Sequence, residues 1–324
     1  MALVGFHASH EQFPPSELLR LVQRAEQAGF QAAMCSDHFH PWNEAQGNSG
    51  HAWTWLGAAM AATRIPFGVV NAPVGRYHPA VIAQAAATLV EMQGDRFWLA
   101  VGSGEALNEC ITGERWPAKD VRNRRLREAV DVMRALWRGE EVSHDGEFTV
   151  ARARLYCLPP KPLPVSAAAL SPGTARWAGE WADGLITVSQ PRDKLRKVIE
   201  AFREGGGAGK PVHLQVKLSW AADEADARQG AFEQWRTNIF ESTVSEDLRT
   251  PEQFEAAAAF VRAEDLERSV RISADLSRHV AWLQEDLEAG IDQLLLHNVN
   301  RGQDAFIEAF GREVLPQLGK AGRP

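Results

Sequence analysis

The sequence predicts an α/β protein of the (β/α)8 barrel class, the TIM barrel. Short apolar runs typical of buried strands alternate with amphipathic helical segments from residue 3 to residue 318. The alternation fits eight strand–helix units, and 324 residues with 45% hydrophobic content suffice for a barrel-sized core. We therefore expect one barrel domain over residues 1–324, with loop insertions near 38–53, 139–160 and 236–268.

The strand predictions rest on short, almost continuously apolar runs, as expected for parallel strands that are buried on both faces. These runs occupy residues 3–6, 32–35, 65–70, 97–101, 165–168, 185–188, 213–220 and 293–297.

The helix predictions rest on amphipathic periodicity and on end signals. The helices are expected at 16–28, 55–62, 79–92, 124–138, 174–181, 194–204, 276–289 and 305–318, with a longer helical and irregular stretch over 223–267. Gly29 ends the first helix, and Pro79 begins the third, where its missing N–H leaves no hydrogen bond unmade. A small hairpin is expected over 141–150, turning at Asp145-Gly146.

A doubly wound open sheet is the alternative fold. That fold normally carries a glycine-rich phosphate turn after its first strand. Here the corresponding segment, residues 7–11, reads His-Ala-Ser-His-Glu and contains no glycine. The barrel is therefore the favoured prediction.

Composition and charge exclude several classes of function. The formal net charge is −7 and no basic stripe is present, so nucleic-acid binding is not expected. We find no run apolar enough to cross a membrane and no signal peptide before the first strand. Cys35, Cys110 and Cys157 are odd in number and widely spaced, as is typical of free thiols in a reducing compartment. We expect a cytoplasmic protein that acts on small molecules.

Two segments place chemically active side chains where a strand ends. Residues 36–42 (Ser-Asp-His-Phe-His-Pro-Trp) follow the second strand, and residues 102–108 (Gly-Ser-Gly-Glu-Ala-Leu-Asn) follow the fourth. An imidazole beside a carboxylate, as in Asp37-His38, suits proton transfer. Small residues before Glu105 would let a flat ligand approach the backbone. Because the carboxyl ends of barrel strands meet at one rim, we predict the active site there.

Other interpretations of these residues remain open. His38 and His40 form a His-x-His pair that can bind zinc. The fifth and sixth strands end without further ligands, and His213 belongs to the opposite rim, so no metal site is expected. Ser171 caps a helix whose N-terminus could bind an anion, and Arg192 could assist or could be a solvated surface residue.

The two segments, together with residues 75–84 (Gly-Arg-Tyr-His-Pro-Ala-Val-Ile-Ala-Gln), resemble the luciferase-like flavin and deazaflavin oxidoreductases. The resemblance is nearest to the branch that contains a glucose-6-phosphate dehydrogenase using coenzyme F-420 (F420), an 8-hydroxy-5-deazaflavin. It is close over residues 3–136 and thinner at 181–184, Lys217 and 294–297. It implies a (β/α)8 barrel with insertions, a homodimer, and hydride transfer between a small organic substrate and a flavin-type ring.

The resemblance also implies residue roles. His38 would exchange a proton with the substrate, Glu105 would act at the ring, and Trp42 would shield the reacting face. Glu11 would lie on the substrate side. The residues expected to hold the cofactor are Asp37, Val70, Asn71, Gly102, Ser103, Gly104, Asn108, Ala168, Ala169 and Ser171.

The sequence differs from that of this branch at the positions where phosphates are expected to bind. Ala169-Leu170 replaces a glycine pair, and residues 189–191 (Ser-Gln-Pro) stand where a lysine is expected. The remaining sugar-phosphate residues have no clean counterparts, although Arg192 and Arg271 could serve the substrate. Glucose 6-phosphate is therefore not the expected substrate, and FMN is slightly favoured over F420 as cofactor.

A strained peptide bond is expected near Val70-Asn71, in a segment that carries a non-prolyl cis peptide in the family. Two other functions stay open: an FMN-dependent luciferase-like monooxygenase and a non-catalytic flavin-binding protein.

Overall fold

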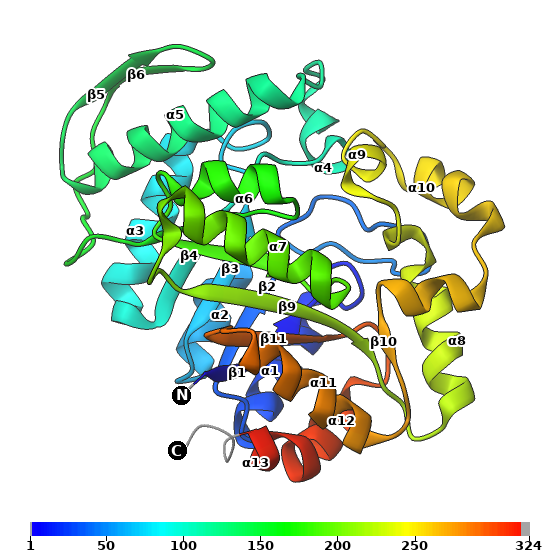
Figure 1. Ribbon diagram of the computed structural model, residues 1–324. Coiled ribbons are helices and arrows are strands. Elements are labelled where there is room, and N and C mark those ends of the chain that lie inside the picture. The colour runs from blue at the N-terminus through cyan, green and yellow to red at the C-terminus, as the bar shows by residue number, and fades with distance from the viewer. Residues whose placement is uncertain (1, 319–324) are drawn as a thin grey trace.

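In a computed structural model, of which residues 2–318 are described, the chain forms a closed parallel barrel (Figure 1). The barrel strands are β1 (Leu3–Ala8), β2 (Ala32–Cys35), β3 (Phe67–Asn71), β4 (Phe97–Val101), β7 (Val165–Ala168), β8 (Gly184–Val188), β9 (Val212–Ser219) and β11 (Gln293–Asn298). The ring closes because β8 pairs with β9, β9 with β11, and β11 with β1. The predicted (β/α)8 class is confirmed.

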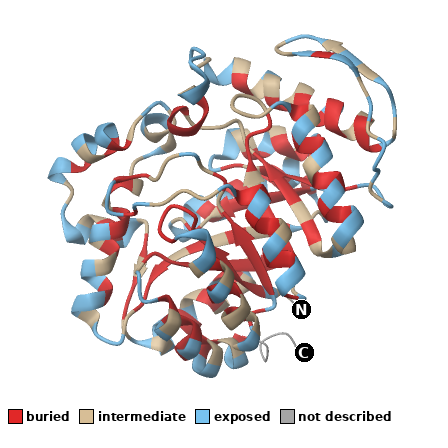
Figure 2. Ribbon diagram, turned by 180° about the vertical axis from the view of Figure 1, so that it is seen from behind, coloured by how far each residue is buried: buried red, intermediate tan, exposed pale blue. Residues whose placement is uncertain are grey.

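Helices surround the barrel and bury their apolar sides against it, whereas their outer sides are exposed (Figure 2). They include α1 (Pro15–Gln27), α2 (Ala52–Ala62), α3 (Pro79–Gln93), α5 (Lys119–Trp137), α6 (Pro172–Gly179), α7 (Arg192–Phe202), α11 (Leu276–Glu288) and α12 (Gln303–Ala309). In α1 the buried residues Leu18, Leu21, Val22 and Ala25 recur at the spacing of one helix face.

Side chains fill the barrel interior below its carboxyl rim. Trp98 lies over Gly68, where an added Cβ would come within 1.9 Å of the indole ring. The ring of His213 meets Trp98 edge-on at 4.7 Å. Above them, Met34, Ala100, Ile186 and Leu295 form a buried cluster. The lower barrel is therefore closed, and any ligand space lies above this cluster.

Three segments depart from the simple alternation of strand and helix. The predicted hairpin is present as β5 (Val142–Asp145) and β6 (Thr149–Ala153), which extends away from the barrel beside α5 (Figure 1). The 236–268 insertion follows α8 (Glu224–Trp235) and contains the short helices α9 (Ser242–Ser245) and α10 (Pro251–Ala257). A two-residue strand, β10 (Arg271–Ile272), pairs with β9 and was not predicted.

The expectation of a strained bond near Val70-Asn71 is wrong. Residues 2–318 contain no cis peptide bond. Strand β3 continues through both residues, with Val70 in register with Ala100 and Asn71 with Val101. Within the same range, no helix combines the length and apolar character needed to cross a membrane.

Candidate active site

A cavity of about 540 Å³ opens at the carboxyl rim of the barrel. This volume lies within the range usual for small-molecule sites. Most of the predicted site residues line it: His38, Trp42, Glu105, Asp37, Val70, Asn71, Gly102, Ser103, Gly104, Asn108, Ala168, Ala169, Ser171 and Glu11. Residues from the ends of five strands, β1, β2, β3, β4 and β7, thus share one space.

His38 faces the cavity with its imidazole fixed from behind. Its Nδ1 atom lies 2.5 Å from Oε1 of Glu11. The other Glu11 oxygen accepts hydrogen bonds from the hydroxyls of Ser9 at 2.8 Å and Ser36 at 2.7 Å. Nε2 of His38 has no hydrogen-bond partner in the described part of the chain, so this nitrogen is available to a ligand.

The Glu11–His38 pair changes the proton affinity of both groups. Burial would lower the pKa of His38, but the adjacent Glu11 carboxylate raises it above its ordinary value. Burial would likewise raise the pKa of Glu11, but the charge of His38 and the hydrogen bonds from His38 and Ser36 hold it well below its usual range. Glu11 therefore stays ionised and keeps the histidine basic.

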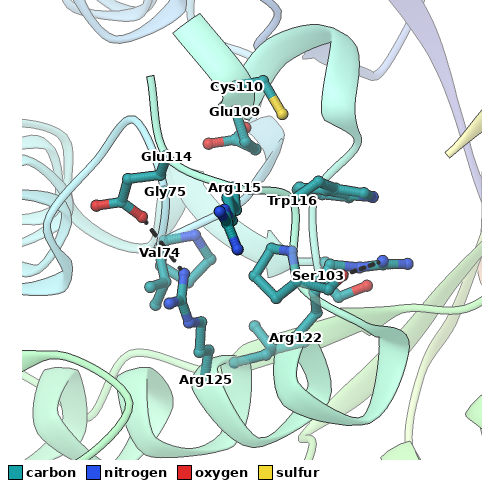
Figure 3. A pocket seen from close by; sticks show the side chains of 14 residues that line it. Val74, Gly75, Ser103, Glu109, Cys110, Glu114, Arg115, Trp116, Arg122 and Arg125 are labelled. Atoms are coloured by element: carbon teal, nitrogen blue, oxygen red, sulfur yellow. Dashed lines mark hydrogen bonds and ion pairs between the residues drawn. The ribbon is translucent and has the colours of Figure 1, made fainter. Parts of the chain in front are cut away.

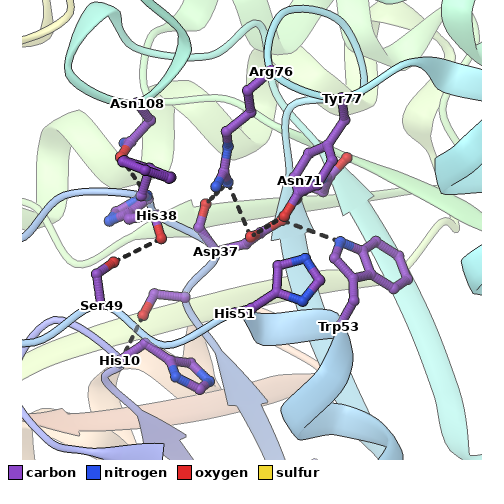
Figure 4. A network of polar contacts seen from close by, with 12 residues as sticks. His10, Asp37, His38, Ser49, His51, Trp53, Asn71, Arg76, Tyr77 and Asn108 are labelled. Atoms are coloured by element: carbon purple, nitrogen blue, oxygen red, sulfur yellow. Dashed lines mark hydrogen bonds and ion pairs between the residues drawn. The ribbon is translucent and has the colours of Figure 1, made fainter. Parts of the chain in front are cut away.

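Asp37, beside His38, is the centre of a polar network (Figure 4). Oδ2 accepts from Asn71 Nδ2 at 2.6 Å and from Trp53 Nε1 at 3.2 Å. Oδ1 accepts from Arg76 Nη2 at 2.9 Å and from the Tyr77 hydroxyl at 3.2 Å. The carboxylate therefore has four protein donors. It anchors the β2–α2 loop, and we expect it to contact a ligand less directly than its neighbours do.

Asn71 gives the first sign of what the cavity could hold. Because Asn71 Nδ2 donates to Asp37, its Oδ1 atom points elsewhere, and this oxygen is buried without a hydrogen-bond partner among residues 2–318. A buried carbonyl oxygen normally accepts a hydrogen bond, so a ligand in this cavity would be expected to supply the donor. The pyrimidine edge of a flavin or deazaflavin ring carries an N–H between two carbonyls, so Asn71 fits such a ring.

The glycine turn after β4 forms one wall of the cavity. Gly104 has a φ of +79°, and a Cβ there would lie 2.9 Å from Cγ of Glu109. At Gly102 an added Cβ would meet only the Ala168 side chain, at 3.6 Å. Gly104 is thus required by the turn, whereas Gly102 leaves space within the cavity.

Glu105 ends this turn and faces the same cavity as His38. Burial raises its pKa, and the charges of His38 and Lys217 act in the opposite direction. Its carboxylate has no hydrogen-bond partner among the described residues, in contrast to those of Glu11 and Asp37. A carboxyl group with a raised pKa and an open face suits proton exchange with a bound ring.

Asn108 and Trp42 shape the histidine loop. Asn108 lies in α4 (Ala106–Glu109), and its Oδ1 accepts from the backbone N–H groups of Phe39 at 2.9 Å and His40 at 3.3 Å. Trp42 meets His38 edge-on at 5.1 Å and packs against Phe254 of the insertion. Asn108 therefore positions the loop, and Trp42 covers one side of the imidazole.

Lys217 and two histidines reach the cavity although no role had been predicted for them. Lys217 projects from β9, where burial lowers its pKa to about 8, and it lies 5.6 Å from the ring centre of Trp235. The ring centres of His7 and His297 lie 4.3 Å apart with the ring planes tilted by 39°, and burial lowers the pKa of His7 to about 4. Polar residues alternate with apolar ones along 213–218 of the sequence, and this period of two could have identified the inward-facing side chains.

The two arginines expected at the substrate lie outside the cavity. Arg271 is bound by Asp286, with Nη1–Oδ2 at 2.5 Å and Nη2–Oδ1 at 2.8 Å. Arg192 is exposed at the start of α7. Neither belongs to the cavity wall, so the structure does not bring them to the other predicted site residues, and their substrate role stays a prediction. Ala169 and Ser171, in contrast, lead into α6, whose N-terminus borders the cavity.

A second hollow, of only about 20 Å³, lies beside the glycine turn (Figure 3). Arg115, Arg122 and Arg125 line it together with Trp116 and Ser103. Residues 2–318 contain no group of three or more His, Cys, Asp or Glu side chains that could hold a metal ion.

Comparison with known proteins gives consistent results over almost the whole chain. A family model described as luciferase-like monooxygenase matches residues 2–293. The F420-dependent glucose-6-phosphate dehydrogenase of Beutenbergia cavernae is 36% identical over 329 residues, covering 98% of both chains. The enzyme of the same name from Nocardia farcinica is 36% identical over 97% of both chains. A solved F420-dependent secondary alcohol dehydrogenase, in complex with an F420-acetone adduct, superposes with a TM-score of 0.90 at 31% identity, covering 98% of this chain and 99% of that one.

Proposed function

The chain belongs to the luciferase-like monooxygenase family, and from this premise we propose that it is an F420-dependent dehydrogenase of small, uncharged alcohols. That it is a flavin- or deazaflavin-dependent oxidoreductase follows from its relatives. The observation that carries the finer proposal is the His38–Glu11 pair, which faces Glu105 across one cavity.

His38 acts as the base in this proposal. The hydroxyl of the alcohol donates to His38 Nε2, and the imidazole takes the proton as the C–H hydrogen leaves with its electron pair. Glu11 fixes the ring orientation through Nδ1 and stabilises the imidazolium that forms. Trp42 and Phe254 keep water from that side of the imidazole.

A bound deazaflavin supplies the hydride acceptor. Asn71 Oδ1 would accept from its ring N–H, and Gly102 would leave room for the flat ring. Glu105 would hold a proton for the ring, since burial keeps its pKa raised. The N-terminus of α6, capped by Ser171, would suit the phosphate of the cofactor.

F420 is the proposed cofactor, because the relatives that match both chains over nearly their full length are named as F420-dependent. This reverses the slight preference for FMN, which rested on Ala169 and Leu170 in place of glycines. Titration of the cofactor-free protein with F420 and with FMN, followed by absorbance or fluorescence, tests the proposal. Tight binding of FMN alone would overturn it.

An uncharged substrate is proposed because, in the described part of the chain, no unpaired cation lies near the cavity rim to bind a phosphate. Within the described residues, Lys119 is paired with Glu246, while Lys217 lies deep in the cavity and close enough to Glu105 for their charges to interact. Arg192 and Arg271 lie outside. Reduction of F420 by a panel of secondary alcohols, measured as loss of its absorbance, would identify the substrate class.

Substitution of His38 tests the chemistry directly. We expect His38→Ala to lower kcat by about 10²–10⁴-fold while the Kd for F420 stays within about threefold, because the imidazole serves the substrate and not the cofactor. Unchanged kcat would remove His38 from the mechanism. Oxygen uptake coupled to turnover would instead support the monooxygenase alternative. The homodimer implied by the resemblance stays a prediction, to be tested by light scattering.

A further inference from the structure

Glu246, in the 236–268 insertion, places a carboxylate on the cavity wall. Its side chain is 18% exposed and contacts two cations of α5: Oε2 lies 3.0 Å from Lys119 Nζ, and Oε1 lies 2.8 Å from Arg122 Nη2. Lys119 also donates to the Ser103 hydroxyl at 3.1 Å. Glu246 thus connects the insertion to the glycine turn that borders the proposed ring site.

Several cationic side chains lie beside Glu246, and one of them, Arg125, is paired with Glu114 at 3.6 Å. Arg122 is only 4% exposed and stacks on Trp116 at 4.4 Å. Arg115 and Arg125 lie in the same hollow (Figure 3). Lys119 begins the 19-residue helix α5, whose N-cap residue, Ala118, has no side chain that could cap the helix. The helix dipole therefore adds positive potential at this point.

Glu246 also lies close to the proposed reaction centre. Its backbone carbonyl accepts from the N–H of Ala106 at 2.9 Å, directly after Glu105. Burial is the main cause of the raised pKa of Glu105, and the charge of Glu246 adds to it. A substrate bound between His38 and Glu105 would therefore be within the electrostatic influence of the Glu246 carboxylate.

From these contacts, and resting on the proposed dehydrogenase function, we infer that Glu246 determines charge specificity. Its carboxylate fills the anion-binding position formed by Lys119, Arg122 and the start of α5. Phosphorylated or carboxylated alcohols bind poorly, because the Glu246 carboxylate repels their anion and already pairs with both Lys119 and Arg122. Uncharged alcohols meet no such barrier.

The test uses inorganic phosphate as a probe of the cofactor-free protein. We expect Glu246→Gln to bind phosphate at least about tenfold more tightly than the original protein, measured by calorimetry. With F420 bound, the ratio of kcat/KM for glucose 6-phosphate to that for 2-propanol should rise by about the same factor. In the double variant Lys119→Met with Glu246→Gln, the gain in phosphate binding should be lost.

Glu241→Gln is the matched control. Glu241 lies in the same insertion, is paired with the exposed Lys194, and does not line the cavity. It should change neither measurement. If Glu246→Gln does not fold, Glu246→Ala takes its place. Equal phosphate affinity in a folded Glu246 variant and the original protein would overturn the inference, as would a gain in affinity that the added Lys119→Met substitution leaves in place. Phosphate binding requires no turnover, so absence of alcohol oxidation would count against the proposed function alone.

Discussion

The Nδ1 atom of His38 and the Oε1 atom of Glu11 lie 2.5 Å apart, although the two residues follow different barrel strands. Glu11 comes from the loop after β1, and His38 from the loop after β2. The parallel pairing of β1 with β2, in which Ala8 is in register with Cys35, brings the two loops together. The barrel thus assembles a histidine–carboxylate pair from residues 27 positions apart.

Substitution Glu11→Gln should move the pH profile of the enzyme. His38 must be neutral to accept a proton, and its pKa is raised by Glu11 against the opposing effect of burial. Alcohol oxidation should therefore increase as pH rises through the pKa of His38. Without the carboxylate, burial dominates, so the acid limb of kcat/KM should shift to lower pH. The measurements are the pH dependence of kcat/KM and NMR titration of His38 in the cofactor-free protein.

Glu44→Gln is a suitable control for this experiment, because it removes an exposed carboxylate from the same loop as His38. Its pH profile should match that of the original protein. An unshifted acid limb in Glu11→Gln would show that Glu11 does not set the proton affinity of His38.

Substitution Asp37→Asn should destabilise the protein strongly. The Arg76 side chain is 7% exposed and would lose its nearest anion. The NH2 group of the new amide would also face hydrogen-bond donors, and it cannot accept from them. We expect a loss of about 3 kcal/mol in the free energy of unfolding. Asp304→Asn breaks an exposed pair with Arg20 and should cost about 1 kcal/mol or less. Denaturant unfolding compares the two, and equal losses would contradict the structural role of Asp37.

The two glycines of the turn should respond differently to alanine. Gly104→Ala places a Cβ 2.9 Å from Cγ of Glu109 at a positive φ, so the protein should lose about 1–3 kcal/mol of stability. Gly102→Ala has no such conflict, and its methyl group would occupy cavity space. Its melting temperature should stay unchanged while its Kd for F420 rises. Normal cofactor affinity in Gly102→Ala would place the ring elsewhere.

Sequence patterns predicted most of the barrel because its strands are buried on both faces. The bounds of β2, β4 and β7 match the predicted apolar runs. Strand β10 was missed because two residues carry no periodicity. Motif spacing predicted that His38 and Glu105 share one cavity. It did not reveal the pairing of Arg271 with Asp286 on α11, since nothing local in the sequence identifies that partner. The pairing of Glu246 with Lys119 spans 127 positions and depends on how the insertion folds back.

Acid should destabilise the protein through its buried histidines. Burial lowers the pKa of His279 from 6.5 to about 4, as it does for His7, His10 and His213. As pH falls, the histidines of the unfolded chain are protonated before those of the folded protein. Their contribution to the free energy of unfolding is therefore fully present above pH 6.5 and is lost as pH falls toward 4. The raised pKa of Glu109, about 7, acts in the opposite direction, because its contribution is lost as pH rises.

Substitution His279→Gln isolates one of these contributions. His279 is 1% exposed, and its Nε2 lies 2.9 Å from the Ser273 carbonyl, a hydrogen bond that the amide of glutamine can replace. The loss of unfolding free energy between pH 7 and pH 5 should shrink by about 2 kcal/mol. His51→Gln, at an exposed position, should leave that loss unchanged. Denaturant titrations at pH 7 and pH 5 measure this loss. An identical loss in the original protein, His279→Gln and His51→Gln would show that His279 is already protonated at pH 5 in the folded protein.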